Sequence, residues 1–212
     1  MRRALAIAGI GVFLVLAIRR FVPVIPLALT HHEPGPVPDP AAEPRQVNVA
    51  GSVPIALSAR QVELVPRAHY EIAAEVVSTA RYRLDAMADV IPWDVALIWG
   101  DLAKEPFRSS MSCYQDARFY LWSTADLSIG RDYIVAHSAN VHVIPATPTI
   151  RAVLAHVRRR DHVALSGDLV DVEGTEGRST HWTTSLSRND VDAGSCETIY
   201  LRSINVNGRV YR

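Results

Sequence analysis

Lysine is almost missing from this chain, and cysteine is scarce. Lys104 is the single lysine among 22 basic residues, and the other 21 are arginine. Together with the many alanine and valine residues, this usage is typical of GC-rich codons and not of a functional choice. The motifs HExxH, CxxC and GxSxG are all missing from the sequence. The sequence therefore shows none of these local signatures of zinc sites and of serine hydrolases.

Net charge is also missing. The chain has 22 basic and 22 acidic residues, so no overall field attracts nucleic acid or acidic lipid, and an electrostatic partner must be recognised by a local patch. A hydrophobic fraction of 49% and a charged fraction of 21% are those of a folded globular protein. The 212 residues allow one domain of ordinary size once the termini are set apart.

The N-terminus has the pattern of a membrane anchor. Two arginines precede an apolar run from Ala4 to Ile18, and Arg19-Arg20 follow it. No small-x-small cleavage pattern follows the run, and no cysteine is placed for lipidation. We therefore predict an uncleaved signal-anchor over residues 1–29. Basic residues flank both sides, so the orientation rests on the short basic N-tail, which favours export of the domain from a bacterial inner membrane to the periplasmic side.

Residues 30–45 are predicted to be a linker. The stretch from His31 to Pro44 carries five prolines and little hydrophobicity, which favours an extended spacer. The adjacent His31 and His32 project in different directions and are interpreted as solvated linker residues.

Residues 46–212 form the predicted globular domain. Short alternating runs between Gln46 and Val65, an aromatic stretch from Ser109 to Trp122, and short runs at Ile134-Val135 and Val141–Ile144 indicate strands. Thr147-Pro148 followed by apolar residues at helical spacing predicts a helix over Thr149 to Arg158.

Two further signals refine this prediction. In His162 to Glu173 the apolar parity changes around Gly167, which indicates a β-bulge or a strongly bent strand. Asn207-Gly208 is a candidate hairpin turn. The predicted fold is mainly β with one inserted helix (α+β), as a small bent sheet or a partly open OB-like barrel. The segment from Ala68 to Met87 is ambiguous, because its period mildly favours a helix while Tyr70, Ile72, Ala74 and Val76 fit one strand face.

The stretch from Arg131 to Pro148 holds the densest group of chemically capable side chains: His137, Ser138, Asn140 and His142. Two histidines five positions apart would meet at one metal if the backbone were irregular, and Ser138 beside a histidine would be a nucleophile. The alternative is structural, with Ser138 and Asn140 satisfying turn backbone groups and the histidines bonding neighbouring strands. We favour the structural interpretation and predict no resident metal or cofactor.

Polar and aromatic groups in the stretch before this one are predicted to form a binding face. Gln115, Arg118 and Tyr120, with Trp122, are expected on one strand, and an OB-like face uses such groups to stack bases or sugars. With Asn140 they are the candidate binding residues. Nucleic acid is disfavoured by the neutral charge and by export.

Cys113 and Cys196 are expected on different strands of one domain in an oxidising compartment, where a disulfide between them would close a long loop. In a cytoplasmic domain both would be free core thiols instead.

Several segments together resemble a group of bacterial membrane-anchored or exported proteins to which no activity is assigned. They span most of residues 68–202 and comprise Pro92–Leu97 with Trp99-Gly100, Gln115 with Arg118–Tyr120, His137–Ala146, Gly167–Val170, Trp182 with Ser185–Arg188, and Gly194–Glu197. The resemblance implies a strand for Tyr70 to Val77, and we adopt that against the period.

The expected function is that of a membrane-anchored envelope protein. Its β-rich domain is expected to bind or scaffold another envelope component without catalysis. The rival hypothesis is an exported hydrolase or metal-dependent enzyme centred on the stretch that contains His137, Ser138, Asn140 and His142.

Overall fold

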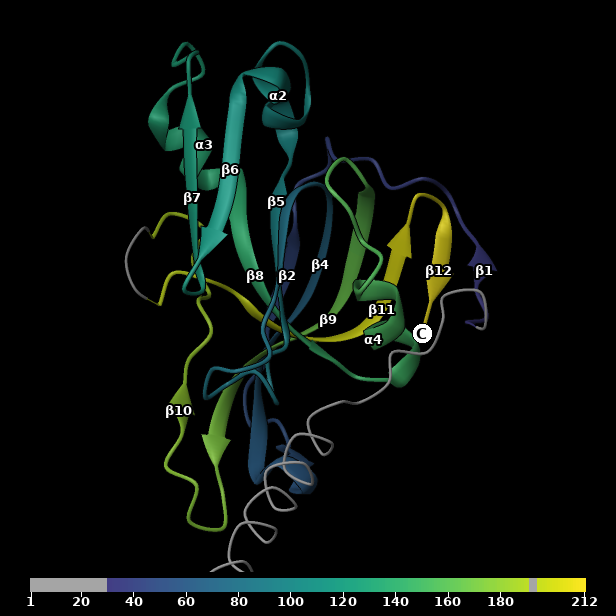
Figure 1. Cartoon of the computed structure of the whole chain (residues 1–212), viewed down its shortest axis with the longest axis vertical. Coiled ribbons are helices and arrows are strands. Elements are labelled where there is room, and N and C mark those ends of the chain that lie inside the picture. Colours follow the sequence, from purple (N-terminus) through teal and green to yellow (C-terminus); the bar gives the residue numbers. More distant parts are fainter. Residues whose placement is uncertain (1–29, 191–193) are drawn as a thin grey trace, which may run out of the picture.

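The computed structural model describes residues 30–190 and 194–212, and the predicted anchor over residues 1–29 lies outside these ranges. No helix within them combines the length and the hydropathy that crossing a membrane requires. The described chain is mainly β, as predicted, with a bent ten-stranded sheet and a separate two-stranded hairpin (Figure 1). The strands are β1 (Glu33–Pro34), β2 (Arg45–Asn48), β3 (Ile55–Leu57), β4 (Val62–Arg81), β5 (Trp93–Ile98), β6 (Met111–Asp116), β7 (Phe119–Thr124), β8 (Ser138–Pro145), β9 (His162–Gly174), β10 (His181–Trp182), β11 (Thr198–Val206) and β12 (Arg209–Tyr211).

Five strands make the body of the sheet. They pair in the order β4, β5, β8, β11 and β9, and β9 also pairs with β4. The β8–β11 pair is parallel and the other pairs are antiparallel. Because β5 and β8 are buried almost throughout, their apolar runs lack the alternation that a half-exposed strand would show.

The ambiguous segment, Ala68 to Met87, is a strand as far as Arg81. β4 runs for 20 residues, and Tyr70, Ile72, Ala74 and Val76 are buried on one face, so the strand adopted for Tyr70 to Val77 is confirmed. The helical period was misleading: Leu84, an apolar residue near the end of this segment, lies beyond β4 and is 86% exposed.

The parity change around Gly167 reflects a bend that β9 shares with its two neighbours. The register shifts by one residue between Pro66 and Ala68 in β4 and between Leu201 and Ser203 in β11. The two extra residues, Arg67 and Arg202, each pair with an aspartate of β9. The predicted bulge is therefore confirmed, although the inserted residues lie on the strands beside β9.

Short helices connect the strands. They are the α-helices α2 (Phe107–Ser110), α3 (Arg131–Ala136) and α4 (Pro148–Leu154), and the 3-10 helices η2 (Ser58–Arg60) and η3 (Gly100–Ala103). Helix α4 is the predicted helix, and the side chain of Thr147 accepts a hydrogen bond from the Ile150 amide at 3.2 Å.

Two predictions were wrong. The described residues contain three short α-helices instead of a single one, and Ile134-Val135 lie in α3 instead of a strand. Tyr133 stacks on His137 with ring centroids 3.7 Å apart, an i, i+4 contact that one helical turn provides. The Ser138 hydroxyl donates to the Ile134 carbonyl four residues earlier and so helps to close the end of α3.

The predicted linker lies along the domain. Its β1 pairs with β12, and the Gly100 amide donates to the Pro40 carbonyl at 2.8 Å. Glu43 reaches His137 and Arg188. Residues 30–45 are therefore in contact with the sheet and do not form a separate spacer, because the prolines leave carbonyl oxygens available for bonds to the domain.

The aromatic stretch from Ser109 to Trp122 is not one strand but the β6–β7 hairpin, which projects at one end of the molecule beside α2 and α3 (Figure 1). Its two turn residues, Ala117 and Arg118, have φ values of 46° and 68°. These left-handed values are those of a tight hairpin turn. The turn at Asn207-Gly208, between β11 and β12, is confirmed with φ values of 51° and 88°.

Replacement of Gly167 by alanine is expected to separate β9 from β11. A Cβ at this position would lie 2.2 Å from the backbone carbonyl oxygen of Tyr200, and a backbone atom cannot move away cheaply. We expect Gly167→Ala to lower the free energy of unfolding by about 1–3 kcal/mol in urea denaturation. Ser166→Ala, one position earlier, is the control and should change it little. Equal stability of the two variants would contradict the close approach.

Candidate functional site

A buried polar network lies at the junction of β5, β8 and the β6–β7 hairpin. Its centre is Asp94, which is fully buried within the apolar strand β5. His142 Nδ1 donates to Asp94 Oδ1 at 2.7 Å, and Asn140 Nδ2 donates to Asp94 Oδ2 at 3.3 Å. The ring of Trp182 meets His142 edge-on with centroids 5.1 Å apart. A buried carboxylate needs such partners, because removing it from water without them costs several kcal/mol.

Arg118 enters the same network from the hairpin turn. Its Nη2 donates to Asp85 Oδ1 at 2.7 Å and to the Ile91 carbonyl at 3.0 Å, and its Nη1 lies 3.7 Å from Asp94 Oδ1. The guanidinium also covers the ring of Tyr82, at 4.1 Å from Cζ to the centroid. Burial, and then the nearby Asp94 carboxylate, raise the pKa of Tyr82 well above its usual value. These contacts hold Arg118 in its left-handed backbone conformation.

The structure does not bring the two predicted histidines together. His142 is buried on Asp94, whereas the side chain of His137 is 16% exposed and bonds the Tyr133 carbonyl and Glu43 Oε1, both at 3.0 Å. The Ser138 hydroxyl is engaged with the Ile134 carbonyl at 2.7 Å. Across residues 30–190 and 194–212, no cluster of three or more His, Cys, Asp or Glu side chains is arranged to hold a metal ion. The contacts of His137, Ser138 and His142 therefore agree with the structural interpretation of this stretch.

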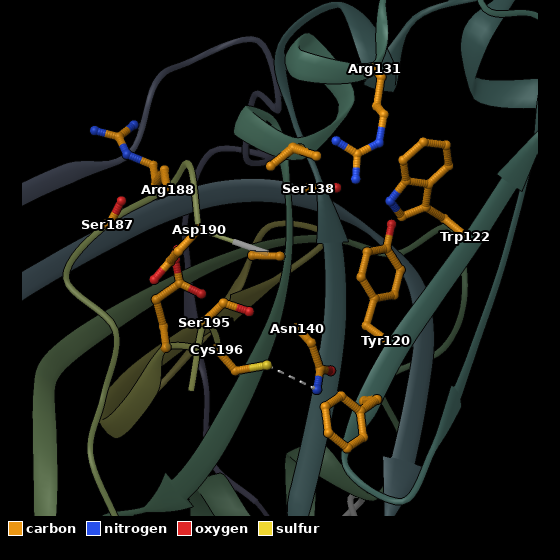
Figure 2. A pocket seen from close by; sticks show the side chains of 14 residues that line it. Tyr120, Trp122, Arg131, Ser138, Asn140, Ser187, Arg188, Asp190, Ser195 and Cys196 are labelled. Carbon is orange, nitrogen blue, oxygen red and sulfur yellow. Dashed lines mark hydrogen bonds between the residues drawn. The ribbon is translucent and has the colours of Figure 1, made fainter. Parts of the chain in front are cut away.

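A pocket of about 190 Å³ opens beside the network. Figure 2 shows Tyr120 and Trp122 of β7 facing Asp190 and Cys196 across it. The lining residues come from the hairpin, from α3 and β8, and from the loop before β11: Phe119, Tyr120, Trp122, Arg131, Val135, Ser138, Ala139, Asn140, Ser187, Arg188, Asp190, Ser195, Cys196 and Glu197.

Glu197 is a strongly perturbed acid in this pocket. The residue is 4% exposed, and burial is the main cause that raises the pKa of Glu197 to about 8. A backbone hydrogen bond opposes this rise, the negative charge of Asp190 adds to it, and Arg188 opposes it weakly. Its carboxyl group is therefore largely protonated at neutral pH and able to donate a hydrogen bond. A strongly shifted acid in a pocket is a recognised mark of a functional site.

The wall opposite the hairpin is held by hydrogen bonds within the loop. The Ser185 hydroxyl donates to Asp190 Oδ2 at 2.6 Å, and the Ser185 amide donates to the Cys196 carbonyl at 3.0 Å. At the rim, Arg188 Nη1 donates to Glu43 Oε2 at 3.3 Å. The segment predicted as a linker thus supplies a carboxylate at the edge of the pocket.

The predicted disulfide is not formed. Cys113 and Cys196, both in the described part of the chain, are free thiols. Cys113 Sγ lies on the hairpin, 3.5 Å from Tyr120 Oη, whereas Cys196 Sγ faces Asn140 Nδ2 at 3.9 Å. Burial raises the pKa of Cys113, and burial with the Glu197 charge raises that of Cys196 to about 12. Both are therefore neutral thiols and poor nucleophiles at neutral pH.

The predicted binding residues divide into two groups. Tyr120 and Asn140 line the pocket, while Gln115 and Arg118 lie behind it in the network. Gln115 Nε2 donates to Asn140 Oδ1 at 2.6 Å, so Asn140 links the two groups. Gln115, Arg118 and Tyr120 were expected on one strand, and the hairpin turn at Ala117 and Arg118 places Gln115 and Tyr120 on different strands.

Three functional candidates were missed or misjudged. Asp94 was not among the predicted site residues, although a carboxylate inside the apolar run from Trp93 to Trp99 is a sequence signal for a buried polar centre. Glu197 and Asp190 carry no comparable signal, since both lie in a polar loop region before β11.

Removal of the Asp94 carboxylate should destabilise the fold strongly. Asp94→Ala leaves His142 and Arg118 partly unpaired in the interior, so we expect a loss of about 3–5 kcal/mol in urea denaturation. The matched control is Asp101→Ala, which breaks only the exposed pair with Lys104 and should change the free energy of unfolding far less. Similar losses in both variants would contradict the central role of Asp94.

Glu197 should make stability depend on pH. Folding raises the pKa of Glu197 from 4.5 to about 8, so between these values the native state binds more protons than the unfolded chain. The contribution of Glu197 to the free energy of unfolding must therefore fall as the pH rises from 4.5 to about 8. In the middle of this pH range the fall is about 1.4 kcal/mol per pH unit. Glu197→Gln cannot titrate, so the wild type should lose stability relative to this variant from about pH 5 to about pH 8. Parallel pH profiles in urea denaturation would show that Glu197 is not the titrating group.

Comparison with known proteins adds no identification to this geometry. No family model matches the chain, and no curated protein or solved structure matches it.

Proposed function

We propose that this protein is a membrane-anchored envelope protein whose β-rich domain binds another envelope component without catalysing a reaction. The anchor pattern over residues 1–29 supports the location, with the domain on the periplasmic side of a bacterial inner membrane. The observation that carries the binding role is the pocket between the hairpin and the loop before β11, which places aromatic rings opposite carboxyl groups. The contacts of Ser138, His137 and His142 with groups of the protein itself support a role without catalysis.

We further propose that the body of the domain is an OB-like barrel. Support comes from the ring of pairings β4, β5, β8, β11 and β9, and from the position of α4 between β8 and β9. Such barrels bind oligosaccharides or oligonucleotides over one sheet face and the adjoining loops. The pocket lies on β8 and on loops of the same end, which agrees with that arrangement, but a likeness of fold does not define a ligand.

The chemistry of the pocket favours a sugar ring of an envelope polysaccharide. Trp122 offers an apolar ring face, Glu197 offers a neutral acid, and Asp190 offers a carboxylate that accepts hydrogen bonds. A volume of about 190 Å³ is below the roughly 300–1,000 Å³ of sites for drug-sized ligands and suits one small ring. The zero net charge disfavours nucleic acid, whose binding depends on neutralising phosphates.

The rival function is an exported hydrolase. The stretch from His137 to His142 was the expected catalytic centre of such an enzyme. It is disfavoured because His137 bonds Glu43 whereas His142 bonds Asp94. One observation supports an enzyme at a different place: Glu197 is protonated near neutral pH beside Asp190, a combination that acid catalysis uses. New reducing ends formed from an oligosaccharide by the wild type but not by Glu197→Gln would favour this rival.

Binding is tested by calorimetric titration of the full chain with N-acetylglucosamine and its short oligomers. We expect saturable binding that Trp122→Ala weakens about tenfold, by analogy with the stacking of a nucleobase on an aromatic side chain, which is worth about 1–3 kcal/mol. Tyr114→Ala is the matched control, since Tyr114 lies on the exposed face of the same hairpin and should leave affinity unchanged. Failure of the wild type to bind, or equal losses in both variants, would overturn the sugar site.

A further inference from the structure

Three arginines outside the pocket include two that act electrostatically on the third, since the charges of Arg60 and Arg81 both reach Arg151. Arg60 belongs to η2, Arg81 ends β4, and Arg151 lies in α4. Two of them share one aromatic ring: the Cζ atoms of Arg81 and Arg151 lie 5.0 and 5.6 Å from the ring centroid of Trp93. Trp93 itself is 2% exposed, so this ring is a fixed platform. Helix α4 is set apart from the β6–β7 hairpin that walls the pocket (Figure 1).

The cluster has no internal counter-ion. In the described ranges, the side chains of Arg60, Arg81 and Arg151 form no hydrogen bond or ion pair, whereas Arg67 and Arg202 each have an aspartate. The nearest acidic influence is Asp89 on Arg60, but Asp89 is already held by Arg178 at 2.9 and 3.1 Å.

The electrostatics of Arg151 agree with this geometry. Burial, followed by the positive charges of Arg60 and Arg81, lowers the pKa of Arg151 to about 10, and no carboxylate opposes the shift. A partly buried charge without a partner is costly, and proteins normally pair such groups. An anion between the guanidinium groups would remove the cost.

We propose that Arg60, Arg81 and Arg151 form a binding site for a phosphate-bearing anion. Guanidinium groups donate two parallel hydrogen bonds to phosphate oxygens, and their planar faces stack on aromatic rings. Trp93 holds two of the three groups by that stacking, which leaves their N–H edges for the anion. The anion is a free inorganic phosphate species or the phosphate of a lipid headgroup, and both present the same oxygen atoms.

The experiment measures the thermal unfolding midpoint of the full chain in a buffer that contains no phosphate. The measurement is then repeated after addition of inorganic phosphate, pyrophosphate or glycerol 3-phosphate. Sodium chloride at matched ionic strength corrects for screening. At about ten times the dissociation constant, a bound anion should raise the midpoint of the wild type by about 3–5 °C. A larger effect of the inorganic anions identifies a free phosphate species, and a larger effect of glycerol 3-phosphate identifies a headgroup.

The variant Arg151→Gln should lose this rise while folding normally, because it removes an uncompensated charge. Without the anion, its midpoint should equal or exceed that of the wild type. Arg209→Gln, an exposed arginine on β12, is the control and should keep the rise. The site is refuted if none of the anions raises the midpoint beyond sodium chloride, or if Arg151→Gln keeps the wild-type response.

Discussion

The carboxylate of Asp94 is buried near the start of the apolar strand β5, and parts of the chain far apart in sequence meet on it. His142 and Asn140 approach from β8, and Arg118 approaches from the hairpin turn. Each partner is needed because a lone carboxylate in the interior is too costly to keep ionised. The hairpin is a separate two-stranded sheet, and Arg118 and Gln115 attach it to the body through polar contacts. Apolar side chains of the hairpin add to this attachment by packing in one cluster with residues of β4, β5 and α3.

This dependence extends to the pocket. Asn140 is bound to Asp94 on one side and lines the pocket on the other, and Gln115 fixes its orientation through a bond of 2.6 Å. Tyr120 and Trp122 lie on β7, so the docking of the hairpin, by this network and by its apolar packing, sets their place at the pocket. The network therefore positions the pocket wall although most of its members do not line the pocket.

Much of the fold could be predicted from local pattern, and the rest depends on contacts that pattern does not encode. Thr147-Pro148 and Asn207-Gly208 specify a helix start and a turn through their own chemistry, and both were found. The hairpin turn at Ala117 and Arg118 was missed because neither residue favours a left-handed backbone, and remote carboxylates hold Arg118 there. Glu197 was missed for a related reason, since its shifted pKa arises from burial that only the folded chain creates.

The contacts of residues 30–45 have a mechanical consequence. A pull applied at residue 30 acts first on the short β1–β12 pair, then on the bond between Pro40 and Gly100, and only then on Glu43. Glu43 holds His137 and Arg188 at the rim of the pocket. Tension along this segment would thus be absorbed in stages before it reached the rim, so the pocket is shielded from small displacements of the chain that precedes the domain and is exposed to large ones.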